Sequence, residues 1–217
     1  MRALFERAEA VFFDFDGVIV DSHDVKTRAF AALYADEHPG IVEAVMAYHD
    51  AYGGMSRYKK FDYFERILLD REPTRERIAE LGDRFAGAVV EAVVASPEIP
   101  GAGALLHALS QRATPSYVAS GTPEEELKQI VTRRGLERYF RAVRGSPAEK
   151  AEILGDLSAR HAHDVSRCLM VGDAMTDYVA AQAVGMPFLG VVKQGHASPF
   201  PQGTTFAATL HVFQEAP

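Results

Sequence analysis

Four short apolar segments stand out in the pattern of hydrophobic and polar positions along the chain. Each is bordered by glycine or proline, and they cover residues 10–15, 116–119, 167–171 and 188–192. Runs of this kind are typical of strands buried on both faces of a parallel sheet. We therefore predict four central strands.

Helical patterns alternate with the later strands. They cover residues 102–112, 123–134, 147–160 and 175–184. Strand and helix in alternation predict an α/β protein with a Rossmann-like open parallel sheet and helices on both faces. In such sheets ligands bind at the carboxyl ends of the strands, so we expect functional residues there.

The stretch after the first predicted strand differs from the rest. It is helix-like almost throughout and lacks a convincing buried strand, and the turn-rich segment 96–101 marks its end. We predict an inserted α-helical cap domain at residues 21–95. The α/β core would then comprise residues 1–20 and 96–217.

Composition and charge narrow the class of partner. Apolar residues make up 47% of the chain and charged residues 24%, which is ordinary for a globular protein. A formal charge of −7 argues against a general binder of nucleic acid or acidic membranes, since both need clustered Lys and Arg. We expect neither partner, and a monomer or weak homodimer.

Two features favour a reducing compartment. Cys168 is the only cysteine, so no intrachain disulfide can form. The N-terminal segment lacks the uninterrupted apolar run of a signal peptide, and no segment approaches the length of a membrane span. We therefore expect a cytoplasmic protein.

An acid pair ends the first predicted strand, in the sequence Asp14-Phe15-Asp16-Gly17. At positions i and i+2 of a strand the two carboxylates would project from one face. Such a pair can simply end a strand and form a turn. However, an unpaired aspartate in a buried apolar segment is costly, so Asp14 needs a metal or hydrogen-bond donors.

The second predicted strand runs into Ser120-Gly121-Thr122-Pro123. Thr122 is predicted to cap the next helix, with Pro123 as its first residue and Glu125 completing a capping box. Ser120 and the amides beside Gly121 would then lie where a phosphate oxygen can bind. Ordinary capping is the alternative.

A similar start is predicted for the next helix, with Ser146 as N-cap, Pro147 first and Glu149 closing the box. Lys150 then falls in the first turn. A cation there opposes the helix dipole, which a nearby anion would explain. A solvated lysine is the alternative.

A second acid pair, Asp173 and Asp177, follows the predicted strand 167–171 and lies one helical turn apart. Both carboxylates can face one site. Oxygen ligands of this type suit a hard divalent cation such as Mg2+. N-capping by Asp173 is the alternative.

In this order, the acid pair, hydroxyl, lysine and second acid pair closely resemble the haloacid dehalogenase superfamily of phosphohydrolases. The resemblance covers about residues 10–20 and 96–195. The place of the helical insertion is similar to the cap of the branch that includes phosphoglycolate phosphatases and β-phosphoglucomutase.

The resemblance implies a chemistry for each motif. Asp14 would be the nucleophile that attacks phosphorus, and Asp16 the acid that protonates the leaving oxygen and later activates water. The phosphoryl oxygens would be bound by Ser120, the amide of Gly121 and Lys150.

The resemblance also implies Mg2+ as cofactor. Its ligands would be Asp14, the main-chain carbonyl of Asp16, and Asp173, with Asp177 as a ligand or its neighbour. Because Asp16 is present, phosphate-ester chemistry is favoured over carbon–halogen or carbon–phosphorus cleavage.

The cap would supply contacts to the leaving group of a small phosphorylated metabolite, such as a sugar phosphate or a phosphoglycolate-like ester. The segment 52–60 combines a Gly-Gly turn with three cations. We expect Gly54, Arg57 and Lys60 to contact the substrate, and His23 to border the site. A solvated helix start is the alternative.

Three functions remain open at this stage. A phosphatase passes the phosphoryl group to water, whereas a β-phosphoglucomutase-like phosphomutase returns it to a sugar. A non-catalytic phosphoacceptor or binding protein is the remoter alternative. We favour a Mg2+-dependent phosphatase that works through an aspartyl-phosphate.

Overall fold

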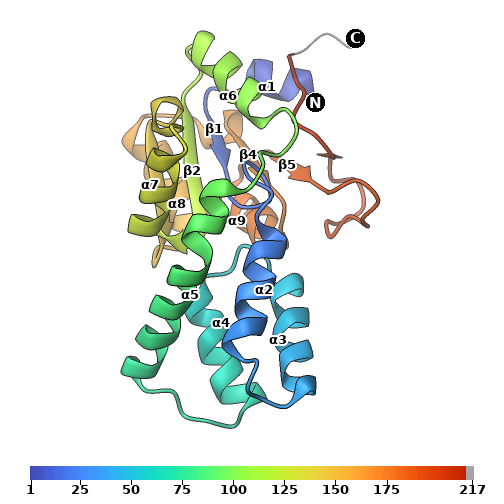
Figure 1. Cartoon of the computed structure of the whole chain (residues 1–217). Helices are drawn as coiled ribbons and strands as arrows, with labels where there is room; N and C mark the ends of the chain where they lie inside the picture. Colours follow the sequence, from blue (N-terminus) through green and yellow to red (C-terminus); the bar gives the residue numbers. More distant parts are fainter. Residues whose placement is uncertain (214–217) are drawn as a thin grey trace.

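A six-stranded parallel sheet forms the centre of the protein, seen here in a computed structural model that describes residues 1–213 (Figure 1). The strand order is β3-β2-β1-β4-β5-β6. The strands are β1 (Val11–Phe13), β2 (Ser116–Pro123), β3 (Ala142–Ser146), β4 (Leu169–Gly172), β5 (Phe188–Val191) and β6 (Phe206–Ala207). β1 lies between β2 and β4, so the three strands that precede the predicted motifs are neighbours.

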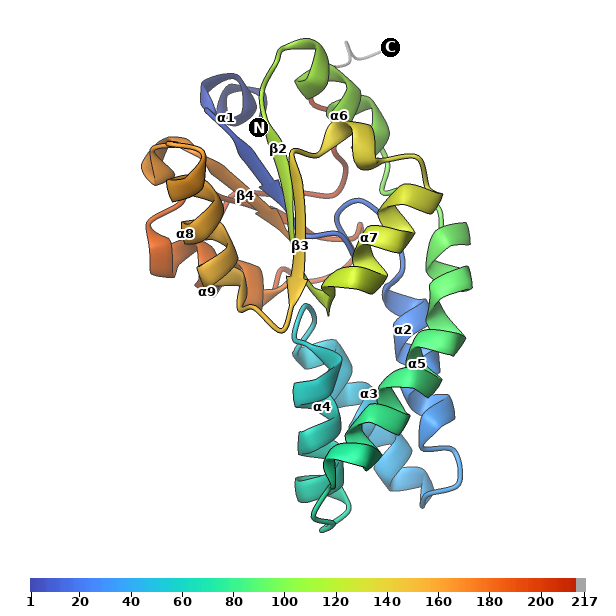
Figure 2. The same ribbon diagram turned by 90° about the vertical axis from the view of Figure 1, so that its left-hand side faces the viewer.

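Helices cover both faces of the sheet (Figure 2). α8 (Lys150–Arg160) and α9 (Met175–Val184) cover one face, and α6 (Ala102–Gln111) and α7 (Glu124–Arg133) cover the other. Side chains of β1 alternate between the two faces: Val11 and Phe13 join the larger core cluster, and Phe12 joins the smaller one beneath α8 and α9. The predicted α/β fold class is confirmed.

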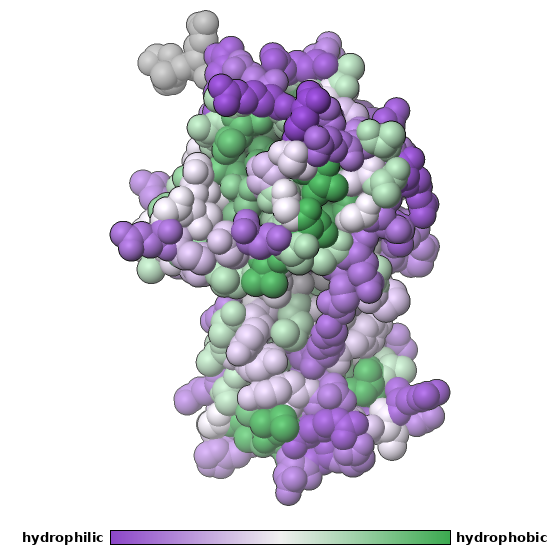
Figure 3. All heavy atoms as spheres, turned by 180° about the vertical axis from the view of Figure 1, so that it is seen from behind, coloured by the Kyte–Doolittle hydropathy of each residue, from purple (hydrophilic) through white to green (hydrophobic). Residues whose placement is uncertain are grey.

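Helices also form a separate unit at one end of the sheet. They are α2 (His23–Leu33), α3 (Pro39–Ala51), α4 (Arg57–Tyr63), the π-helix η1 (Phe64–Leu68) and α5 (Arg75–Ala95). At the centre of this helical unit, the ring of Phe30 contacts the rings of Phe61, Phe64 and Phe85. Seen from behind, the molecule narrows between this unit and the sheet (Figure 3). Within the described residues, no helix is both long enough and apolar enough to cross a membrane.

Several short elements were not predicted from the pattern. They are α1 (Arg2–Arg7), β3, β6, η2 (Glu137–Tyr139) and η3 (Val165–Arg167). The pattern did not predict β3 because this strand carries Arg144 in its centre and is only partly buried at its start. β1 ends at Phe13, so Asp14 and Asp16 lie in the loop beyond the strand, and the alternation rule does not fix the direction of their side chains. Residues 214–217 of the predicted core domain lie outside the described residues.

Two of the predicted helix starts are wrong. β2 extends through Pro123 and α7 begins at Glu124, so Thr122 does not cap the helix, and its hydroxyl bonds to Asp16 instead. Ser146 belongs to β3, and α8 begins at Lys150 with a capping box between Glu149 and Glu152. In both cases the strand continues into residues that resemble a cap. Lys150 is nevertheless in the first turn, as predicted.

Removal of the Phe12 ring should destabilise the protein strongly. Phe12 is fully buried and stacks on Tyr117 with ring centroids 4.8 Å apart. We expect Phe12→Ala to lower the free energy of unfolding by about 3–5 kcal/mol, measured by urea unfolding with circular dichroism. The matched control is Phe206→Ala, because Phe206 is 52% exposed, and it should cost less than about 1 kcal/mol. Equal costs would show that the β1 face is not a packed core.

Candidate active site

Three carboxylates meet at the ends of β1 and β4. Asp14, Asp173 and Asp177 each offer an oxygen, and these oxygens lie within 4.8 Å of one another. Asp14 and Asp177 are buried, whereas Asp173 is partly exposed. Lys150 enters from the first turn of α8 and donates to Asp14 Oδ2 at 2.7 Å and to Asp177 Oδ1. The structure therefore brings together the residues of three predicted motifs.

The electrostatics of this cluster are unbalanced. Burial and the neighbouring carboxylates raise the pKa of Asp173 well above its ordinary value. Burial also raises the pKa of Asp177 to about 6, although Lys150 opposes the shift. Burial disfavours a charged Lys150, yet Asp14 and Asp177 outweigh it and raise the lysine pKa. When all three carboxylates are ionised, they and the Lys150 ammonium together carry two negative charges, which fits a divalent cation such as Mg2+.

The carboxylate of Asp16 is not part of this cluster. It accepts hydrogen bonds from Ser22 Oγ at 2.6 Å and Thr122 Oγ1 at 3.0 Å, and it pairs with Lys26 on α2. Burial alone would raise the pKa of Asp16, but the Lys26 ammonium outweighs burial and lowers it to about 2. Asp16 is therefore ionised, and Lys26 of the helical unit stabilises this charged form.

The carboxyl end of β2 approaches the helical unit closely. Ser120 is buried, and its Oγ accepts from the amide of Thr122 at 3.3 Å. A Cβ atom on Gly121 would lie 2.2 Å from the carbonyl oxygen of Gly54. Gly54 has φ +72° and itself has no room for a side chain, since a Cβ would lie 2.8 Å from Lys150 Nζ. Both glycines are thus required by the close contact between the end of β2 and the turn that contains Gly54.

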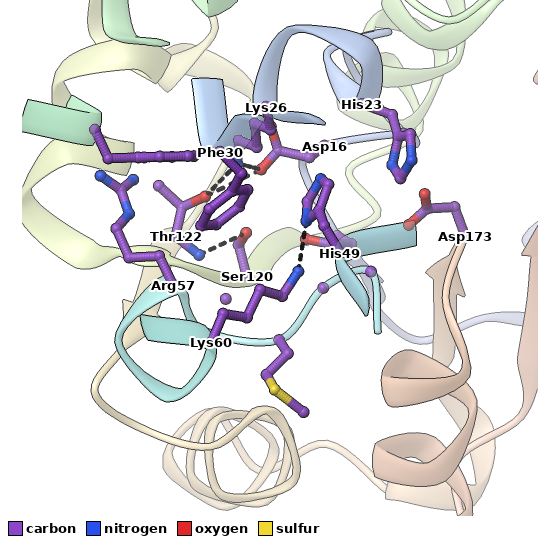
Figure 4. A pocket seen from close by; sticks show the side chains of 17 residues that line it. Asp16, His23, Lys26, Phe30, His49, Arg57, Lys60, Ser120, Thr122 and Asp173 are labelled. Carbon is purple, nitrogen blue, oxygen red and sulfur yellow. Dashed lines mark hydrogen bonds and ion pairs between the residues drawn. The ribbon is translucent and has the colours of Figure 1, made fainter. Parts of the chain in front are cut away.

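A cavity of about 50 Å3 lies between the sheet and the helical unit (Figure 4). Its walls include the predicted residues Asp14, Asp16, Ser120, Gly121, Asp173, His23, Gly54, Arg57 and Lys60. Lys150 and Asp177 lie behind this wall. The structure therefore places all the sequence-predicted site residues in or beside one cavity.

Arg57 and Lys60 do not belong to a solvated helix start. Arg57 is 5% exposed, pairs with Glu126 of α7 and lies over the Phe85 ring at 4.6 Å. Lys60 is 1% exposed, and its Nζ lies 2.7 Å from His49 Nδ1. Both residues line the cavity from α4, and Figure 4 shows the Lys60 side chain directed at His49.

His23 borders the cavity at the first residue of α2. Its Nε2 lies 3.0 Å from Asp50 Oδ1, and its ring stacks on His49 with centroids 5.1 Å apart.

Three residues of the site were missed in the sequence. Lys26 lies three residues after His23, so the two share a face of α2, and this spacing was a usable signal. Thr122 was interpreted as a helix cap. His49 gave no signal, because it reaches the site only through the packing of α3 against α2.

Comparisons with known proteins agree with this geometry. A 5'-nucleotidase of Pseudomonas aeruginosa is 26% identical over 196 residues, covering 88% of this chain and 86% of the relative. A phosphoglycolate phosphatase of Yersinia pestis is 29% identical over 201 residues, covering 86% and 82%. The crystal structure of a β-phosphoglucomutase from Clostridium difficile has the same fold, with a TM-score of 0.74, 15% identity and coverage of 95% and 93%.

The family models give a match that spans most of the chain. Residues 8–185 match the model described as haloacid dehalogenase-like hydrolase. The match includes all the carboxylates of the site, Lys150 and the whole helical unit. The chain therefore belongs to the haloacid dehalogenase-like hydrolases, the family that its motifs resemble.

Proposed function

We propose that this protein is a Mg2+-dependent phosphatase of a small phosphorylated metabolite, working through an aspartyl-phosphate on Asp14. The observation that carries the proposal is the cluster of Asp14, Asp173 and Asp177 with Lys150, which bears two negative charges when all three carboxylates are ionised and borders a cavity. The phosphatase names of the relatives support it.

In the first step Asp14 attacks phosphorus, the bond from phosphorus to the leaving oxygen breaks, and Asp16, which takes up a proton when the substrate binds, gives this proton to the leaving oxygen. Asp14 is held in line by its bond to Lys150 and by the amide of Phe15, which donates to its Oδ1 at 2.7 Å. Asp14, Asp173 and Asp177 would hold Mg2+, which screens the negative charge of the phosphoryl group when bound. Lys150, with Ser120 and the Gly121 amide, would bind phosphoryl oxygens.

In the second step water attacks phosphorus, the bond from phosphorus to the Asp14 oxygen breaks, and phosphate leaves. Asp16, which the first step leaves ionised beside Lys26, is the base that we assign to this water, and it takes the proton that the water loses. Ser22 and Thr122 fix the carboxylate from two sides.

The helical unit at residues 21–95 is the part that we propose acts as a cap. α4 bridges to the core through Arg57 with Glu126 and through Lys59 with Glu149, the latter at 2.5 Å. Thr176 also donates to the carbonyl of Gly53 at 2.9 Å. These contacts hold the helical unit against the core beside the cavity, where it would limit the access of bulk water to the reacting phosphoryl group.

Loss of the nucleophile should abolish phosphate release. We expect Asp14→Asn to lower kcat by about 1,000-fold or more on every ester that wild type hydrolyses. The measurement is phosphate release from phosphoglycolate, sugar phosphates, nucleotides and p-nitrophenyl phosphate. Asp83→Asn is the matched control, because Asp83 is exposed on α5 and should leave the rates unchanged.

Two results would contradict the proposal. Undiminished phosphate release by Asp14→Asn would exclude the aspartyl-phosphate. An isomerised sugar phosphate without free phosphate would instead identify a phosphomutase.

Removal of divalent metal should also stop the reaction. We expect EDTA to abolish phosphate release and added Mg2+ to restore it. Asp173→Asn should raise the Mg2+ concentration for half-maximal activity by about tenfold or more, because it removes one of three carboxylates. Asp83→Asn again serves as control. Full activity in EDTA would show that the cluster does not need a metal.

A further inference from the structure

Lys60 differs from the other cations of the site. Each of the others pairs with a carboxylate: they are Lys26, Arg57 and Lys150. The Nζ atom of Lys60 lies 2.7 Å from His49 Nδ1 and 5.6 Å from the centre of the Phe30 ring. Within the described residues, no carboxylate lies within ion-pair distance of it. Lys60 is therefore a buried cation without a counter-ion.

The His49 ring beside it is also incompletely bonded. An ammonium group only donates hydrogen bonds, so Nδ1 accepts from a charged Lys60 and the ring proton resides on Nε2. His49 is 4% exposed, and Nε2 is buried without a hydrogen-bond partner in the described part of the chain. A buried donor of this kind is normally satisfied. His49 Nε2 thus lacks a hydrogen-bond acceptor and Lys60 lacks a counter-ion, and one anion could satisfy both.

The position of the pair identifies where that acceptor would come from. Both residues line the cavity that also contains Asp14, and Figure 4 shows Lys60 directed at His49 on the cap side of this cavity. The phosphoryl group belongs at Asp14, so the cap side receives the leaving group. Burial, together with the charges of Lys26 and Lys150, lowers the pKa of Lys60 to about 7, as expected for a cation that lacks an anion.

We propose that Lys60 and His49 form a subsite for a second anionic group, carried by the leaving group of the substrate. This inference rests on the proposed phosphatase function and names its substrate class. Carboxylate and phosphate share the required chemistry. The substrates are then phosphate esters whose leaving group carries a second negative charge.

Three two-carbon esters test the subsite directly, because they differ only in the terminal group. Phosphoglycolate carries a carboxylate, 2-hydroxyethyl phosphate a hydroxyl, and ethylene glycol bisphosphate a second phosphate. We expect wild type to show a kcat/KM about 10- to 100-fold higher for phosphoglycolate than for 2-hydroxyethyl phosphate, the range for hydrogen bonds to a charged group. Comparison of the bisphosphate with phosphoglycolate shows whether the subsite prefers a phosphate or a carboxylate.

Variants assign the preference to the pair. Lys60→Met should reduce the ratio between phosphoglycolate and 2-hydroxyethyl phosphate to below about threefold, and His49→Phe should reduce it by about tenfold. Lys59→Met is the matched control, since Lys59 is the neighbouring lysine of α4 and is 56% exposed. It should leave the ratio unchanged. A variant that merely folds less well lowers both rates and also leaves the ratio unchanged.

A binding measurement keeps the inference separate from the phosphatase function. In Asp14→Asn with Mg2+, calorimetry should give tighter binding of phosphoglycolate than of 2-hydroxyethyl phosphate, and Lys60→Met in that background should remove the difference. Equal hydrolysis and equal binding of the three esters would overturn the subsite while the phosphatase stands. Tighter binding of phosphoglycolate without any phosphate release by wild type would support the subsite and contradict the proposed phosphatase function.

Discussion

Mutual repulsion among buried carboxylates is the constraint on which the rest of the structure depends. Asp14, Asp173 and Asp177 are brought within 4.8 Å by the adjacency of β1 and β4, which are central strands with no freedom to separate. Lys150 neutralises only part of this charge. Such an arrangement is unfavourable for folding and is retained where the charge has a use, which under the proposed function is to hold a divalent cation beside Asp14.

A further charge interaction joins the core to the helical unit across the cavity. Asp16 comes from the core, yet its charged partner Lys26 comes from α2, so the ionisation of the proposed acid and base depends on where the helical unit lies. Contacts that fix this position include the ion pair of Arg57 with Glu126 and the close approach of Gly54 to Gly121. Movement of the unit would therefore change both access to the cavity and the proton affinity of Asp16.

Sequence alone predicted the parallel sheet, the helical insertion and the residues that meet at the strand ends, because parallel strands force their following loops to one edge. It could not predict the local ends of elements. Thr122 and Pro123 have the composition of a helix start, but pairing with β3 continues the strand through them. The contacts of the helical unit were still less accessible, since His49 and Lys60 meet only through the packing of α3 and α4.

The named relatives act on leaving groups as different as a nucleoside and glycolate, although this chain shares similar identity with each. Identity over the whole chain mainly reflects the sheet and the strand-end motifs, which determine how phosphorus is attacked and not what leaves. Selection of the leaving group depends on the few side chains that α2, α3 and α4 direct into the cavity. In this chain those side chains include an unpaired Lys60 and an unsatisfied His49, so the charge of the leaving group, more than its size or sugar character, is the property that the cap is built to recognise.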